Sequence, residues 1–170
     1  KNHIHLEKFD AAHMSVDRLL EYIREGTDDR IYAISQLMGM GVDPSLICNR
    51  TQIDMFFLDK IKKIVDFERE LERAPHDPAT LREAKRMGFS DSYIAELWNT
   101  TEDEVYGWRV RENIFPVYKM IDTCASEFAS YVPYFYSTYE EENESIVSGK
   151  EKIIVLGSGP IRISQGVEFD

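Results

Sequence analysis

One local pattern recurs along residues 15–113: a residue that caps a helix N-terminus, an apolar stripe at helical spacing and, after three of these helices, a glycine. Ser, Thr and Asp side chains accept hydrogen bonds from the free N–H groups of a first helical turn, and glycine ends helices because it adopts positive φ easily. The predicted caps are Ser15, Thr27 or Asp28, Asp43, Asp77, Ser90, and Thr100 or Thr101, of which Thr101 has a glutamate three residues later. The pattern therefore restricts this part of the chain to short helices joined by tight turns.

The longest helix is predicted from Asp54 to about Arg73. Its apolar residues recur at helical spacing, so all of them are expected to face a core. They are Phe57, Leu58, Ile61, Ile64, Val65 and Leu71. The stripes of the shorter helices include Leu19, Leu20, Ile23, Ile31, Ile34, Leu37, Met38, Leu46, Ile47, Leu81, Ala84, Ile94, Leu97 and Trp98.

Two stretches of this helical region resemble each other, residues 41–47 and residues 88–94. Each contains a turn, an acidic residue and an inward-facing isoleucine, and each precedes a threonine and a new helix. A duplicated pair of helical hairpins would explain the similarity, and so would capping chemistry that recurs without duplication.

The amino-acid composition changes at residues 114–139, where aromatic and β-branched residues become frequent. Pro116 and Pro133 interrupt the helical pattern there. This composition predicts extended segments and one short helix near residues 123–128. The acidic run at residues 140–144, with Ser148 and Gly149, indicates a solvated linker. The domain boundary is therefore expected between about residues 142 and 151.

Residues 152–170 predict a buried strand that enters a glycine-rich turn at Gly157 and Gly159. A dinucleotide-binding loop needs a third glycine where Arg162 stands, whereas arginine at a helix N-terminus favours an anion. A strand-to-helix turn without a ligand is the other interpretation. A parallel strand needs a crossover and a second strand, so we expect a piece of a larger protein that stops inside its next domain.

Charge and composition exclude several classes of function. The formal net charge is −11, and basic residues are interleaved with acids, so nucleic acid and anionic membranes are unfavourable partners. His3, His5 and His13 match no zinc-site spacing, and no metal is expected. Neither a nucleophile elbow nor a P-loop lysine is found, so no catalytic residue is assigned.

Two isolated cysteines, Cys48 and Cys124, are too few for a disulfide framework. We find neither a signal peptide nor an apolar run of about 18 residues, the length that predicts a membrane span. The predicted location is therefore cytoplasmic.

Residues from about 27 to 170 resemble the large chain of carbamoyl-phosphate synthase. The matching stretches are DRIYAIS (29–35), IDMFFLDKIK (53–62), AKRMGFSD (84–91), PVYKMIDTCASEF (116–128), YSTYEEE (136–142) and the glycine loop. The resemblance implies a helical oligomerisation domain that lies between two ATP-grasp halves, followed by the first strand and loop of the second half. The expected fold is mainly α, a helical bundle with a short extended aromatic segment and a truncated α/β start of the pre-ATP-grasp kind. The expected domains are residues 1–145 and 146–170.

The resemblance also implies an activity and its partners. The intact enzyme would make carbamoyl phosphate from glutamine-derived ammonia, bicarbonate and two ATP, with Mg²⁺ and K⁺, for pyrimidine and arginine synthesis. This piece would bind no cofactor and would be inactive by itself. Its partners would be a second copy, as dimer or tetramer, the remaining synthetase domains and a glutaminase small chain. The alternative function is a stand-alone phosphate- or nucleotide-binding module that uses the loop at residues 157–168.

The family's loop at the start of each half lines the internal passage for carbamate. By resemblance, the residues of this passage are Gly157, Gly159, Arg162, Gln165, Gly166 and Glu168. Glu168 would orient the intermediate, and Gly166 would keep the passage open. The family usually has glycine where Ser164 stands, and a side chain there would narrow the loop or change its turn.

Overall fold

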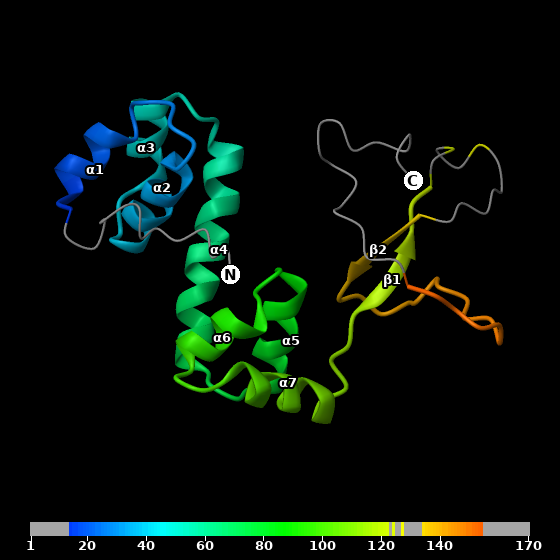
Figure 1. The fold of residues 1–170 in the computed structure, drawn as a ribbon. Coiled ribbons are helices and arrows are strands. Elements are labelled where there is room, and N and C mark those ends of the chain that lie inside the picture. Colours follow the sequence, from blue (N-terminus) through cyan, green and yellow to red (C-terminus); the bar gives the residue numbers. More distant parts are fainter. Residues whose placement is uncertain (1–13, 123, 125–126, 128–133, 155–170) are drawn as a thin grey trace.

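The computed structural model describes residues 14–122, 124, 127 and 134–154 (Figure 1). This part of the chain contains seven helices and two short strands, so the prediction of a mainly α fold is confirmed. The helices are α1 (Val16–Tyr22), α2 (Arg30–Gly39), α3 (Pro44–Thr51), α4 (Met55–Arg73), α5 (Pro78–Arg86), α6 (Asp91–Leu97) and α7 (Glu102–Arg111). The strands are β1 (Val117–Met120) and β2 (Phe135–Thr138).

Helix starts follow the predicted capping chemistry. Six N-cap side chains accept a hydrogen bond from a backbone N–H of the first turn: Ser15, Asp43, Asp54, Asp77, Ser90 and Thr101. Thr101 and Glu104 complete a capping box. The prediction for α2 is wrong, because its N-cap is Asp29 rather than Thr27 or Asp28. The Asp29 carboxylate makes no capping bond and instead accepts a 2.6 Å hydrogen bond from the Tyr22 hydroxyl.

Two of these caps are carboxylates whose pKa is shifted by the bonds that they accept. Hydrogen bonds from the Ser45 side chain and backbone lower the pKa of Asp43, and those from Thr80 do the same for Asp77. The Thr80 bonds to Asp77 are 2.8 Å from the backbone N–H and 2.7 Å from the hydroxyl. Since the charged carboxylate is the better acceptor, both caps weaken when they are protonated.

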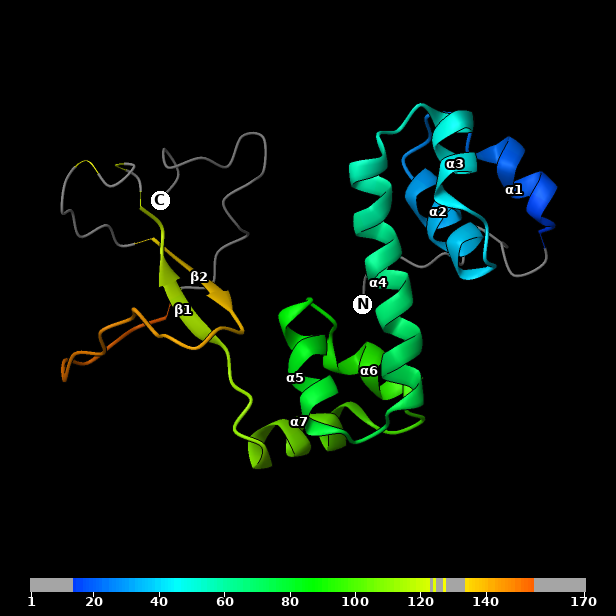
Figure 2. The same cartoon turned by 180° about the vertical axis from the view of Figure 1, so that it is seen from behind.

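Helix α4 is shared by two helical units (Figures 1 and 2). The first unit consists of α1–α3 and α4 up to about Val65, and α4 contributes Leu58 and Val65 to its core. The second unit consists of α5–α7 and the second half of α4, which contributes Leu71. Both views show α1–α3 beside one half of α4 and α5–α7 beside the other.

The sharing of α4 corrects the prediction for its apolar stripe. At 3.6 residues per turn, Leu58 and Leu71 lie on different faces of the helix, so the stripe must cross from one face to the other. Phe57 and Ile64 stand at heptad spacing from Leu71, on the face that α5–α7 cover only in the second half. They are 59% and 47% exposed. Their predicted core positions are therefore wrong, because the neighbours that would cover them pack further along α4.

Two other residues of the predicted stripes are exposed, so their predicted core positions are wrong: Ile31 of α2 and Leu46 of α3. Most of the predicted stripes are buried. The confirmed core residues are Leu19, Leu20, Ile23, Ile34, Leu37, Met38, Ile47, Leu58, Val65, Leu71, Leu81, Ala84, Ile94 and Trp98.

The two units repeat each other's backbone. The same sequence separation lies between Gly41 and Gly88, between Ile47 and Ile94, and between Gln52 and Asn99. Both glycines have positive φ, +88° and +91°, where they end α2 and α5, and Gln52 and Asn99 also have positive φ. Both isoleucines are fully buried. The similarity therefore extends from capping to the core, which favours the duplicated hairpin over coincidental capping.

The aromatic segment forms the predicted extended structure. Strands β1 and β2 are antiparallel, with Val117 opposite Thr138 and Met120 opposite Phe135. The other edge of β1 is bonded by residues 143–144, because Glu144 N–H donates to the Tyr118 carbonyl over 2.9 Å. The predicted linker at residues 140–144 is thus exposed but partly hydrogen-bonded to the sheet. The short helix predicted near residues 123–128 falls almost wholly outside the described residues.

No helix within the described ranges is both long enough and apolar enough to cross a membrane.

Candidate functional site

The predicted carbamate-passage residues lie outside the described residues. They are Gly157, Gly159, Arg162, Gln165, Gly166 and Glu168, and Ser164 stands among them. The same holds for His3, His5 and His13. These assignments therefore stay predictions. Among the described residues, no group of three or more His, Cys, Asp or Glu side chains is arranged to hold a metal ion.

An exposed aromatic face lies on the first half of α4. The face consists of Phe56, Phe57, Lys60 and Ile64, and the two phenylalanine side chains are 60% and 59% exposed. Their rings meet edge to face with centroids 5.4 Å apart, and Lys60 Nζ lies 5.0 Å from the centre of the Phe56 ring. Apolar side chains gathered on one exposed helix face are typical of a surface that contacts another protein.

The second unit shows that the fold does not require apolar residues at these positions. Helix α7 is the counterpart of α4 in the repeat, since Val105 takes the buried place of Leu58. The positions that correspond to Phe56, Phe57 and Ile64 are Asp103, Glu104 and Arg111. Because the corresponding helix of the second unit carries charged residues there, the packing that the two units share does not explain the aromatic face.

A second candidate is a buried ion cluster made by Lys85 of α5, Asp91 of α6 and Arg109 of α7. Lys85 and Arg109 are 8% and 7% exposed. Lys85 Nζ lies 2.7 Å from Asp91 Oδ1, and Arg109 reaches Asp91 Oδ2 through Nε at 2.8 Å and Nη2 at 2.6 Å. One carboxylate therefore serves two buried cations, and the cluster keeps a net positive charge.

Backbone carbonyls and an aromatic side chain complete the cluster. Lys85 Nζ donates to the Phe89 carbonyl over 2.6 Å, and Arg109 Nη1 donates to the Ile114 carbonyl over 3.3 Å. Arg109 Nη1 also donates to the Tyr139 hydroxyl over 3.0 Å. Burial raises the pKa of Tyr139, although Arg109 opposes the shift, so the phenol stays neutral and its oxygen accepts the hydrogen bond.

Helical spacing in the sequence marks two members of this cluster. Lys85 and Arg109 each stand four residues after a fully buried apolar residue, Leu81 and Val105 respectively. Positions four apart lie on one helix face, so each cation occupies a core position, where charged residues are paired when they occur. The distant partner Tyr139 could not be found in this way, because only the fold brings it to α7.

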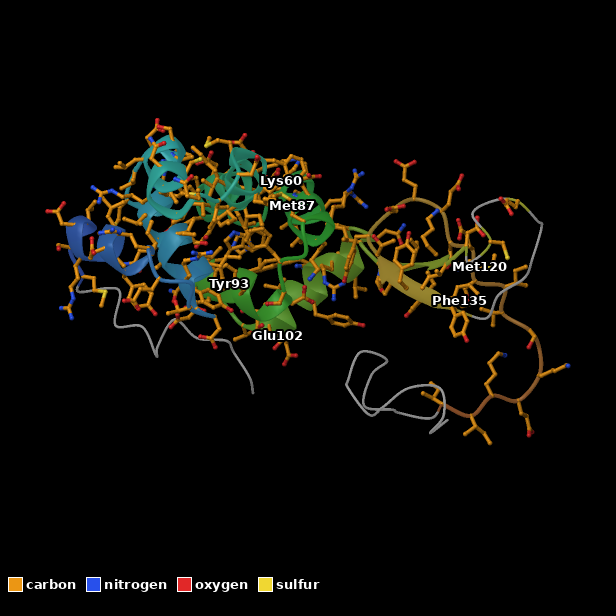
Figure 3. All side chains as sticks on the ribbon, turned by 90° about the horizontal axis from the view of Figure 1, so that it is seen from above. Lys60, Met87, Tyr93, Glu102, Met120 and Phe135 are labelled. Atoms are coloured by element: carbon orange, nitrogen blue, oxygen red, sulfur yellow. The ribbon has the colours of Figure 1, made fainter. Side chains whose placement is uncertain are left out.

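The second unit is held to α4 by contacts that also use polar atoms. Tyr93 of α6 donates to the Glu68 carboxylate of α4, and burial raises the pKa of the Tyr93 hydroxyl. Trp98 Nε1 donates to the Leu71 carbonyl over 2.7 Å. Tyr93 and Glu102 lie on the helical part in Figure 3, whereas Met120 and Phe135 lie side by side in the sheet, beyond the helices. The helices thus form one packed body, and the sheet projects from it.

The described residues form a mainly α domain in which two repeated units share α4 and a small sheet follows. The family model for the oligomerisation domain of the carbamoyl-phosphate synthetase large chain matches residues 1–113. The match covers 113 of 170 residues, and the chain belongs to this family. It ends directly after α7, so both helical units lie inside the match and the sheet lies outside it.

Proposed function

We propose that this chain mediates self-association of a carbamoyl-phosphate synthase large chain through the aromatic face of α4. The family match supports the self-association, since the family is described as an oligomerisation domain. The single structural observation that carries the choice of surface is the exposure of Phe56, Phe57 and Ile64 on one face of α4. Burial of apolar area drives protein association, and aromatic residues contribute most of it.

Sedimentation velocity across a wide concentration range tests this proposal. The unmodified chain is expected to form dimers or tetramers as its concentration rises. Phe57→Glu is expected to shift this equilibrium to monomer, because a charge on an exposed position disturbs the interface without disturbing a core. Ile146→Glu is the matched control, since Ile146 is 83% exposed and lies far from α4 in the sequence.

Two outcomes would contradict the proposal in different ways. A chain that stays monomeric at every concentration would remove self-association as the function of this domain. A Phe57→Glu variant that assembles like the unmodified chain would keep self-association and exclude the α4 face as its surface. Circular dichroism of each variant checks that the helices are unchanged.

We also propose that the domain links the two ATP-grasp halves of a glutamine-dependent, cytoplasmic enzyme that uses ATP, Mg²⁺ and K⁺ and supplies pyrimidine and arginine synthesis. The family membership and the resemblance of residues 146–170 to the start of the second half support this role. Within it, the glycine loop would line the carbamate passage through Gly157, Gly159, Arg162, Gln165, Gly166 and Glu168.

The passage is tested by Gly166→Phe in the intact enzyme, whose added ring is expected to block carbamate transfer. Hydrolysis of ATP by the first half should continue while the output of carbamoyl phosphate falls. Gly149→Phe, in the linker before the loop, is the control and should leave the output unchanged. Equal output from the Gly166 variant and the unmodified enzyme would refute the passage assignment.

A further inference from the structure

We propose that the buried ion cluster of Lys85, Asp91 and Arg109 is a receptor for Tyr139, and that the two form a latch that holds the sheet segment on the second unit. The sheet segment consists of β1, β2 and residues 143–144. The proposal concerns how the helical domain is coupled to the part of the chain that follows it, and it is independent of self-association.

The net positive charge of the cluster favours an electron-rich, neutral partner such as the Tyr139 side chain. Two buried cations share one carboxylate, and a buried charge that lacks a partner is strongly unfavourable. The Tyr139 ring centre lies 5.2 Å from Lys85 Nζ and 5.7 Å from Arg109 Cζ, and its oxygen accepts from Arg109. The electron-rich face and the hydroxyl oxygen of one side chain thus both meet the excess positive charge.

The first unit shows that the helices pack without such a cluster. Its positions corresponding to Lys85, Asp91 and Arg109 are Met38, Pro44 and Lys62. Met38 is buried among apolar residues, and Lys62 pairs with a neighbouring acid at the surface. A unit of this architecture therefore needs no buried ions to fold. The feature that accompanies the cluster in the second unit is the contact with Tyr139.

The contact with Tyr139 stabilises the sheet more than it stabilises the helices. It has two strands of four residues each, and a two-stranded sheet of that size is only marginally stable by itself. Tyr139 directly follows β2, and the chain then turns back to bond the other edge of β1 through residues 143–144. Fixing Tyr139 therefore restrains the chain at the point where it passes from one edge of β1 to the other.

Hydrogen exchange of backbone amides in the 170-residue chain tests the latch. Tyr139→Ala is expected to speed exchange of the Ile121 and Glu144 amides at least about fivefold, the factor that corresponds to one lost hydrogen bond. The amides of Leu58 and Ile94 in the helices should keep their rates. Tyr106→Ala is the matched control, because the Tyr106 ring also lies near Arg109, at 5.3 Å from Cζ, but comes from α7 itself. It should leave the sheet amides unchanged.

Sheet amides that exchange at the same rate in Tyr139→Ala and the unmodified chain would overturn the proposal. Equal acceleration by Tyr106→Ala would also overturn it, because the effect would then come from the loss of any ring near Arg109. If Tyr139→Ala unfolds the second unit, Tyr139→Phe decides the matter. This variant keeps the ring and removes only the hydrogen bond from Arg109. Faster amide exchange that is confined to the sheet would support the latch. Unchanged amide exchange would refute it.

Discussion

The choice of face on α4 is tested by two neighbouring substitutions, Leu58→Ala and Phe57→Ala. Leu58 is fully buried in the first unit. Its truncation removes three carbon atoms from a packed core, at about 0.8 kcal/mol each, and leaves a cavity that adds to the loss. We therefore expect Leu58→Ala to lower the free energy of unfolding by about 3 kcal/mol.

Phe57→Ala should cost much less, although phenylalanine is the larger residue. The side chain is 59% exposed, so most of its apolar surface stays in water in the folded state. The higher helix propensity of alanine offsets about 0.5 kcal/mol of whatever burial is lost. The expected loss is below about 1 kcal/mol, which is typical of surface substitutions rather than of core aromatic ones.

Urea unfolding followed by far-UV circular dichroism measures both values, at a dilution where the chain is monomeric. With a denaturant slope of about 2 kcal/mol/M, Leu58→Ala should lower the midpoint by about 1.5 M and Phe57→Ala by less than about 0.5 M. Equal slopes for all three proteins are the control, since they show that the same surface is exposed on unfolding. A Phe57→Ala loss that matches or exceeds that of Leu58→Ala would refute the orientation of α4.

Other consequences can be checked with the same unfolding assay. Gly107→Ala should raise the free energy of unfolding by about 0.5–1 kcal/mol, because Gly107 lies within α7 and an added Cβ would meet nothing within 4 Å apart from the backbone of α7 itself. Gly88→Ala should lower it by about 1 kcal/mol despite equal space, since Gly88 has a φ of +91°. Asp91→Asn leaves two buried cations without their carboxylate and should cost about 3–5 kcal/mol, while unchanged stability would refute the ion cluster. Asp43 and Asp77 have lowered pKa values in the folded state, so their contribution is fully present above about pH 5 and is lost as pH falls below about 4. Melting temperatures from pH 7 to 3 should fall only in that acidic range, and less so in Asp77→Asn.

Local chemistry determined the helices and their boundaries. Ser15, Asp43, Asp77 and Ser90 cap the helices that the sequence predicts, because a cap depends on a side chain and N–H groups two or three residues away. The predicted cap of α2 is wrong by one residue: Asp29 stands at the N-cap, and its carboxylate accepts from Tyr22 instead of capping the helix. The end of α5 at Gly88 is also determined locally, because a positive φ depends on the conformational freedom of that one residue.

Tertiary structure decided which faces of these helices are covered and which distant residues meet. Periodicity places Phe57 and Leu58 in one apolar stripe, but only the packing of two units on different faces of α4 exposes the first and buries the second. Similarly, helical spacing marks Arg109 as a charge in a core position, whereas its bond to Tyr139 depends on how the chain returns after β2. The sequence by itself determines interactions within a few residues. Contacts across 30 positions depend on the relative placement of whole elements, which no local pattern specifies.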